Sequence, residues 1–310
     1  MTRDFKYLLI TLLPMLSIGF FIPKWSNDAL AWKSNDSHLS TFSKLNFSPE
    51  DHSPDVLFFG TSRTMNGIHT PELNRLSSRT HLNLGINWFG HGLRLSQLES
   101  YLGTFQPRAV VVEVPLLYRF KDHPHLNHTL QPSTLSSLMS ASPLKAVKAA
   151  LSQGPRWVTQ CLIKDSLPES SRIKNSGYLQ INTPAGLGNS ATDWAKAELN
   201  NLNRSPLPFP NKLKSYYYHY RYSHQWHHLK KMSQICQSKN VAFFLLAIPK
   251  CGFDTGDPSI RKQQESIAPV WSPPRETLQH PELWRDVGHL NEKGALKLAS
   301  WLNRRLEESL

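Results

Sequence analysis

Short apolar runs that end in turn residues recur along this chain, and the stretches between them have the spacing of amphipathic helices. Four runs have the length and composition of buried strands. They are DVLFFG (55–60), THLNLGI (80–86), AVVVEVP (109–115) and VAFFLLAIP (241–249). Helical patterns start at Thr70 and at Gly92. Strands that alternate with helices predict βαβ units, and therefore an α/β fold with a mostly parallel sheet between two helical layers.

The pattern breaks down between Pro115 and Val241, where the sequence mixes helical and loop-like stretches and contains several prolines. A compact domain rarely holds a loop of more than about 12–15 residues without secondary structure. We therefore expect a large mixed helix and loop insertion at about residues 118–212, which shapes a substrate groove. A helix over residues 214–239 is expected to lead back into the sheet.

The N-terminus combines a basic start with an apolar run from Tyr7 to Pro23. This run is short for a membrane-spanning helix but within the usual range, so residues 1–23 are expected to be an uncleaved membrane anchor. A signal peptide is the alternative, since Ala29-Leu30-Ala31 has the small-x-small pattern of a cleavage site. Both predict an exported chain that faces the periplasm or the cell exterior. The polar residues 24–52 are then a linker to a folded domain over residues 53–310.

The chain is strongly basic, with a formal net charge of +12 at pH 7. Nearly all of the excess lies beyond the N-terminal run. For an exported domain this charge favours anionic partners such as phospholipid headgroups or acidic cell-envelope polymers, not nucleic acid. A solvated surface without a partner is the alternative.

Three cysteines, Cys161, Cys236 and Cys251, are too few for a disulfide scaffold and lack the spacing of a metal site. An exported chain could pair two of them, and the sequence does not say which.

An acidic residue and a histidine stand close together near the C-terminus, in LWRDVGHLNEKGALKLAS. Asp286 precedes His289 by three residues, and Asn291 is the expected N-cap of the helix that follows. In a turn, this spacing can place carboxylate and imidazole on the same side. The carboxylate can then fix the tautomer of the imidazole and leave its other nitrogen free to accept a proton from a hydroxyl.

Ser62 supplies a hydroxyl in a suitable setting, directly after the first strand. Open α/β sheets keep their sites at this carboxyl edge. A helix N-terminus there would also favour a developing oxyanion. Each of the three residues alone could be a helix cap, but their order favours Ser62 as nucleophile, His289 as base and Asp286 as orienting acid.

Two other features have more than one interpretation. Arg63, beside the serine, could bind an anionic group of the substrate or form a salt bridge within the fold. His224 and His228 are four residues apart in YYYHYRYSHQWHHLKK (216–231). That run contains no Asp or Glu, and a zinc site needs further ligands. A helix that buries aromatic side chains and carries histidines at its edge is the favoured interpretation, so no metal is expected.

The blocks FFGTSRT, NLGINWFGHG and DVGHLNEKGA, in this order, resemble the SGNH (GDSL-like) hydrolase superfamily. The most similar branch is membrane-anchored and exported, and it is related to DltD-type and alginate O-acetylation proteins. The resemblance covers residues 55–115 and 241–310 but not the insertion. It implies a flavodoxin-like sheet, and Ser62, His289 and Asp286 match the nucleophile, the base and the acid of the family.

The resemblance also implies an oxyanion hole formed by the Ser62 N–H, a glycine N–H after the second strand and an Asn side chain after the third. Gly90 is the favoured glycine. The third strand ends in VVEVPLLY and has no such Asn, so either Asn87 fills the role or the hole has two donors.

These observations predict an exported serine acyltransferase or esterase that needs no cofactor. Its substrate would be O-acyl groups, in the first place O-acetyl groups, of a cell-envelope polysaccharide or anionic polymer, and a membrane-bound O-acyltransferase is a candidate partner. Nothing in the sequence decides whether the acyl acceptor is a polymer or water. The alternative is a non-catalytic scaffold of the same fold that binds polysaccharide or the acyltransferase. The missing Asn supports the scaffold, and the retained Asp286–His289 pair counts against it.

Overall fold

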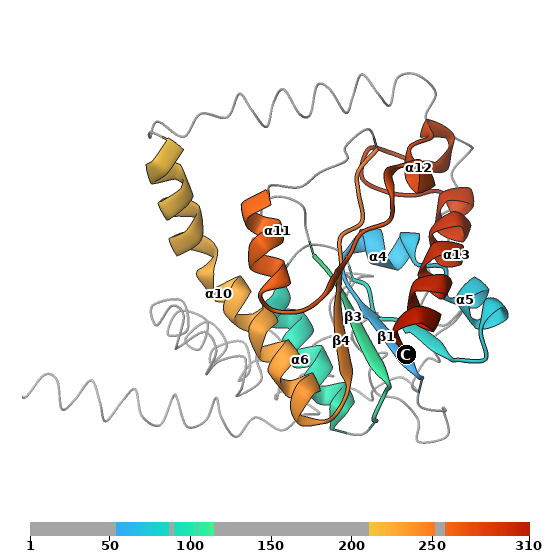
Figure 1. Ribbon diagram of the computed structural model, residues 1–310, viewed down its shortest axis with the longest axis horizontal. Coiled ribbons are helices and arrows are strands. Elements are labelled where there is room, and N and C mark those ends of the chain that lie inside the picture. The colour runs from blue at the N-terminus through green and yellow to red at the C-terminus, as the bar shows by residue number, and fades with distance from the viewer. Residues whose placement is uncertain (1–53, 87–89, 104, 115–210, 252–257) are drawn as a thin grey trace, which may run out of the picture.

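The computed structural model describes residues 54–86, 90–103, 105–114, 211–251 and 258–310 of the chain. Within them, five parallel strands form one sheet in the order β2-β1-β3-β4-β5 (Figure 1). The strands are β1 (Val56–Phe59), β2 (His81–Asn83), β3 (Ala109–Glu113), β4 (Ala242–Leu246) and β5 (Val270–Trp271). This is the flavodoxin-like order, in which the chain reverses direction across the sheet between β1 and β3. The predicted α/β fold with a parallel sheet is confirmed.

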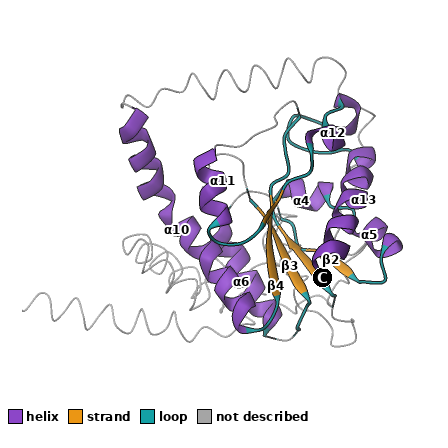
Figure 2. Ribbon diagram, in the orientation of Figure 1, coloured by secondary structure: helices purple, strands orange, loops and turns teal. Residues whose placement is uncertain are grey.

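Helices cover both faces of the sheet (Figure 2). Those in the described residues are α4 (Ser62–Gly67), α5 (Thr70–Leu76), α6 (His91–Leu102), α10 (Asn211–Ser238), α11 (Pro258–Glu265), α12 (Arg275–Leu278), the 3-10 helix η3 (Pro281–Leu283) and α13 (Glu292–Ser309). In Figure 1, α6, α10 and α11 lie on one side of the sheet, and α5, α12 and α13 lie on the other. The arrangement is the expected three-layer one.

The strand β1 contributes to two hydrophobic cores because successive side chains point to opposite faces. Leu57 and Phe59 of β1 pack in the core beneath α6 and α10. Val56 and Phe58 pack in the core beneath α5 and α13. All four side chains are fully buried. Burial on both faces explains why this strand appears in the sequence as a continuous apolar run.

The two cysteines in the described residues belong to different cores and are both buried free thiols. Cys236 packs in the core beneath α6 and α10, whereas Cys251 packs in the opposite core. A disulfide between these two is therefore absent. Cys161 lies outside the described residues.

The four strands expected from the sequence are confirmed, and the helix expected over residues 214–239 is α10. Sequence reasoning missed β5, which has only two residues and so shows no periodicity. β5 exists because its backbone pairs with β4 and because Trp271 stacks on Phe244, with ring centroids 4.2 Å apart. Both are contacts between segments far apart in the chain.

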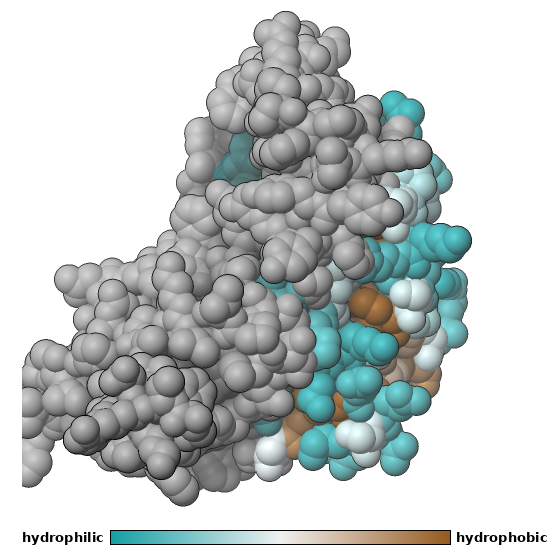
Figure 3. Space-filling view, turned by 90° about the vertical axis from the view of Figure 1, so that its left-hand side faces the viewer, coloured by the Kyte–Doolittle hydropathy of each residue, from teal (hydrophilic) through white to brown (hydrophobic). Residues whose placement is uncertain are grey.

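The expected anchor (1–23), the linker (24–52) and residues 118–210 of the expected insertion lie outside the described residues. None of the helices that the structure describes is long and apolar enough to cross a membrane. On the face shown in Figure 3, the described surface is mainly hydrophilic, with small hydrophobic areas between the polar side chains.

Candidate active site

Ser62 is the first residue of α4, and the turn before it is held in place by local contacts. Thr61 is the N-cap, and its hydroxyl accepts a hydrogen bond from the Arg63 amide at 3.1 Å. Gly60 directly follows β1 in a crowded place, because a Cβ there would collide with the side chains of Thr64 and Glu113. The turn therefore needs glycine, and it brings the serine to the carboxyl edge of the sheet.

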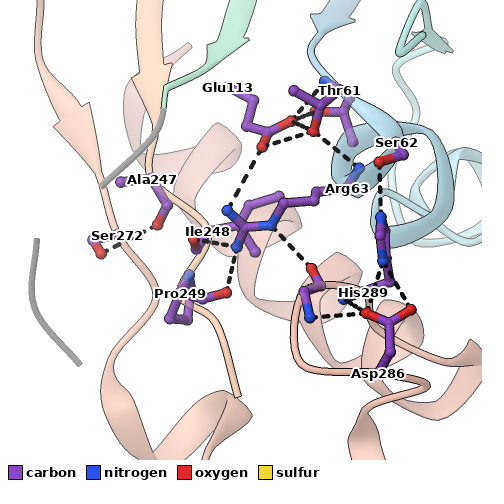
Figure 4. A network of polar contacts seen from close by, with 12 residues as sticks. Thr61, Ser62, Arg63, Glu113, Ala247, Ile248, Pro249, Ser272, Asp286 and His289 are labelled. Carbon is purple, nitrogen blue, oxygen red and sulfur yellow. Dashed lines mark hydrogen bonds and ion pairs between the residues drawn. The ribbon is translucent and has the colours of Figure 1, made fainter. Parts of the chain in front are cut away.

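The structure brings Ser62, His289 and Asp286 together (Figure 4). Ser62 Oγ lies 2.7 Å from His289 Nε2, although 227 positions separate the two residues in the chain. On the other side of the ring, His289 Nδ1 lies 2.8 Å from Asp286 Oδ1 and 2.9 Å from Oδ2. With the carboxylate accepting from Nδ1–H, the Nε2 atom is left to accept from the serine hydroxyl. This is the arrangement that the sequence predicts.

Asp286 and His289 are held by a short closed loop before α13. An antiparallel bridge between Trp284 and Leu290 closes the loop at its base. Inside it, Asp286 Oδ1 accepts from the backbone amides of Gly288 at 2.8 Å and of His289 at 2.9 Å. The carboxylate therefore organises the loop and orients the imidazole at the same time. Asn291 caps α13 as expected, accepting from the Gly294 amide.

The pKa of Asp286 lies well below its usual value. Partial burial alone would raise it, but the hydrogen bond and charge of His289, the Gly288 amide and Arg285 together favour the charged form more strongly. The Asp286 carboxylate is consequently ionised at neutral pH, as a group that accepts from the imidazole must be.

Arg63 interacts within the fold, which is the second of the two interpretations that the sequence allowed. Its Nη2 donates to the backbone carbonyls of Ile248 and Pro249, each at 2.5 Å, and its Nε donates to the Gly288 carbonyl at 3.0 Å. Its Nη1 lies 3.8 Å from Glu113 Oε1. The side chain is buried, and its guanidinium faces backbone carbonyls of the protein (Figure 4).

Glu113 is a member of the site that sequence reasoning missed. The carboxylate is buried at the end of β3, and its Oε2 accepts from the Thr61 amide at 2.7 Å, the Thr61 hydroxyl at 2.8 Å and the Thr64 hydroxyl at 2.6 Å. Burial alone would raise the pKa of Glu113, but the charges of Arg63 and Arg94 and these donors lower it. The only signal for Glu113 in the sequence was its place as a single acidic residue at the end of an apolar strand.

Of the three expected oxyanion-hole residues, the structure describes Ser62 and Gly90. Among the described residues, the Ser62 amide has no acceptor, whereas the amides on either side of it donate to Glu113 and to Thr61. Gly90 is buried at the N-cap of α6 with φ 133°, a conformation that favours glycine, and no hydrogen bond between the described residues joins it to Ser62. Asn87 lies outside the described residues.

The expectation that His224 and His228 lie at the edge of a helix is wrong. Both side chains are fully buried on the face of α10 that packs against α6. Gln225 links the two helices, because it accepts from the His91 amide at 2.7 Å while its side chain lies 3.0 Å from His224 Nε2. The polar residues that make this buried contact are the reason why the sequence predicts a helix edge here. Within the described residues, no group of three metal-ligating side chains could hold a metal ion.

Comparisons with known proteins give only distant matches. No protein-family model matches the chain, and no curated protein matches it. Among solved structures, it is similar to a GDSL-like lipase from Bacteroides thetaiotaomicron at 10% identity and a TM-score of 0.37, over 82% of this chain and 88% of that one. It is also similar to a "putative acylhydrolase" from Bacteroides fragilis at 10% identity and a TM-score of 0.40, over 93% and 99% of the two chains. At such low similarity, the roles of residues in this chain rest on its own geometry.

Proposed function

We propose that this protein is a serine acyltransferase or esterase in which Ser62 forms an acyl-enzyme. The observation that carries the proposal is the unbroken hydrogen-bonded series from Ser62 Oγ through the His289 imidazole to the Asp286 carboxylate. A serine hydroxyl is a poor nucleophile at neutral pH unless a base takes its proton, and this series supplies that base.

In the first half of the reaction, Ser62 Oγ attacks the acyl carbonyl carbon while His289 Nε2 takes the hydroxyl proton. The Asp286 carboxylate stabilises the imidazolium that results. The carbonyl oxygen becomes an oxyanion, and the Ser62 amide is the donor that the chain offers to it. When the tetrahedral intermediate collapses, the bond to the leaving oxygen breaks and His289 returns the proton to that oxygen. The acyl group remains on Ser62.

In the second half, an acceptor hydroxyl attacks the acyl-enzyme with His289 again as base. The proton passes to Ser62 Oγ as the ester bond to the enzyme breaks. A polymer hydroxyl as acceptor makes the protein a transferase, and water makes it an esterase. His289 lies between Ser62 Oγ and the Asp286 carboxylate, so the same imidazole can take and return the proton in both halves of the reaction.

For the substrate, we propose O-acetyl groups of an exported cell-envelope polysaccharide or anionic polymer. Two features support this class: the sequence blocks that resemble the exported SGNH branch, and the net charge of +12. The proposal includes anchoring through residues 1–23, and a membrane-bound O-acyltransferase that supplies or receives the acyl group.

The test is covalent labelling of the purified full-length protein, in detergent, with a fluorophosphonate probe. Wild type is expected to label, Ser62→Ala is expected to lose labelling, and His289→Ala is expected to label far more slowly than wild type. Matched controls are Ser266→Ala and His280→Ala, which change an exposed serine and an exposed histidine away from the site and should label like wild type. If folded wild type does not label, the catalytic proposal is wrong and a polysaccharide-binding scaffold becomes the better explanation.

The acyl donor and acceptor are then identified with O-acetylated polysaccharide. Release of free acetate in a Ser62-dependent manner indicates an esterase, whereas transfer of labelled acetyl groups to a second polymer indicates a transferase.

A further inference from the structure

Arg63 joins the two halves of the candidate active site through its buried side chain. Its backbone directly follows Ser62, while its Nε donates to the carbonyl of Gly288, the residue directly before His289. One side chain therefore connects the neighbour of the nucleophile to the neighbour of the base.

The same guanidinium also contacts the sheet. Ile248 and Pro249, whose carbonyls accept from Nη2, follow β4 directly after its last paired residues. These carbonyls are fixed in position because the paired residues of β4 lie directly before them. Arg63 thus holds the loop that carries His289 against the end of the sheet, and not only against α4.

Glu113 holds Arg63 and the serine turn from the other side. It lies 3.8 Å from Arg63 Nη1 and accepts three hydrogen bonds from Thr61 and Thr64, the residues that flank Ser62 and Arg63. Figure 4 shows Glu113, Arg63 and the Ser62–His289–Asp286 series as one connected network. The ends of β3 and β4 therefore both bear on the geometry of the site.

Stability alone does not explain a buried arginine at position 63. Replacing a buried ion pair by apolar side chains of similar volume is often neutral or stabilising. What an arginine adds is a planar fork of donors that can bind several carbonyls in fixed directions, which lysine cannot reproduce.

We propose that Arg63 is a positioning residue of this site: it holds the Gly288–His289 segment so that Nε2 of the imidazole meets Ser62 Oγ, and Glu113 keeps Arg63 in place. This inference rests on the proposed function and adds a determinant of its rate. It predicts that Arg63 acts through His289, because its hydrogen bond to the base loop (residues 284–290) is to the carbonyl of Gly288, the residue before His289.

The kinetic test is a double-mutant cycle on the rate of fluorophosphonate labelling. Arg63→Lys and Arg63→Gln are expected to lower the labelling rate constant about 10²-fold, the size of effect known for misplacement of a catalytic group by about 1 Å, while probe binding before the covalent step changes little. In the His289→Ala background, Arg63→Gln is expected to lower the residual Ser62-dependent rate no further. Equal losses in both backgrounds would overturn the proposal, because they would mean general structural damage.

Arg79→Lys is the matched control, since Arg79 also pairs with a glutamate but does so at the opposite end of the described domain, against α13. It should leave the labelling rate unchanged. Arg63→Met provides a third variant if either polar replacement fails to fold, because an apolar side chain of similar length removes all the donors and adds no polar group of its own.

A second measurement is independent of activity. The Gly288 and His289 amides donate to Asp286, so their hydrogen–deuterium exchange reports whether the base loop is held. Arg63→Lys and Arg63→Met are expected to accelerate exchange over residues 286–290 and to leave β1 protected. If wild type does not label but exchange responds in this way, the proposed function is wrong, while the role of Arg63 in holding the loop of His289 is supported. If wild type labels, and the Arg63 variants label and exchange like it, the function stands and the positioning role is wrong.

Discussion

The backbone amide of Thr61 donates to Glu113 Oε2 at 2.7 Å, one residue before the proposed nucleophile. The resemblance to SGNH hydrolases implies an Asn side chain after this third strand, directed at the oxyanion. The end of β3 instead carries a buried carboxylate that binds the serine turn itself. The strand thus serves the site by holding the nucleophile in place, and this relationship has measurable consequences for stability.

Glu113→Gln is expected to lower the free energy of unfolding by about 3 kcal/mol, because breaking a buried ion pair from one side leaves Arg63 and Arg94 buried without their counter-charge. Urea denaturation at pH 7 measures the change. Glu276→Gln, at an exposed position on α12, is the control and should change stability by less than about 0.5 kcal/mol. A Glu113→Gln protein as stable as wild type would show that the carboxylate charge contributes nothing to this turn.

Asp286→Asn is expected to reduce the fluorophosphonate labelling rate by about 10⁴, since an amide can donate to the imidazole and favour the wrong tautomer. The fold is expected to survive, because the Asn oxygen can still accept from the Gly288 and His289 amides. The control is Asp55→Asn, which changes an acidic residue that pairs with Arg108 before β1 and should leave the labelling rate unchanged. Labelling by Asp286→Asn at the wild-type rate would remove Asp286 from the mechanism.

His81 is expected to make the protein less stable as the pH falls from about 6.5 to 4. Burial lowers the pKa of His81 from 6.5 to about 4, so in this range the unfolded chain takes up a proton that the folded protein does not. The contribution is fully present above pH 6.5 and is lost on acidification, and it amounts to about 3 kcal/mol at most.

His81→Gln, which can still donate to Asn74 Oδ1 but does not titrate, should show a shallower loss of stability between pH 6.5 and 4 in urea denaturation. His280→Gln, at an exposed histidine, should follow wild type. Asp286, Glu113 and His91, whose pKa values are also lowered, are the same in both proteins, so the difference between the two profiles reports His81. Identical pH profiles for wild type and His81→Gln would contradict the prediction.

Gly294→Ala is expected to destabilise the protein, although alanine normally favours a helix over glycine by about 1 kcal/mol. A Cβ at this position in the first turn of α13 would collide with the Leu283 carbonyl and with the Leu290 side chain. Overpacking of this kind typically costs about 1–3 kcal/mol. Thermal unfolding of Gly294→Ala and of Ser300→Ala, an exposed change on the same helix, tests the sign, since only the first should lower the melting temperature.

Local patterns in the sequence were sufficient for much of this structure. The strands β1, β3 and β4 are runs of apolar residues long enough to stand out, and Asn291 is a cap residue in front of a periodic helix. Asp286 and His289 are three residues apart, so one turn brings them together whatever the rest of the chain does. The pairing of this turn with Ser62 followed from the rule that parallel sheets gather the loops at the carboxyl ends of their strands.

Long-range contacts decided the rest. From the sequence alone, Arg63 could equally have bound an anion, because its partners Ile248 and Gly288 lie far away in the chain. Glu113 is part of the site only because β3 lies beside β1. His224 and His228 were expected at the edge of their helix, because nothing in the local sequence shows that α6 packs against them. The sequence by itself determined the strands β1 to β4, the Asp286–His289 turn and the place of the serine, because these depend on neighbours in the chain. The tertiary structure alone decided which charges and imidazoles are buried and what they bind, because their partners lie up to 225 positions away and meet them only when the sheet assembles.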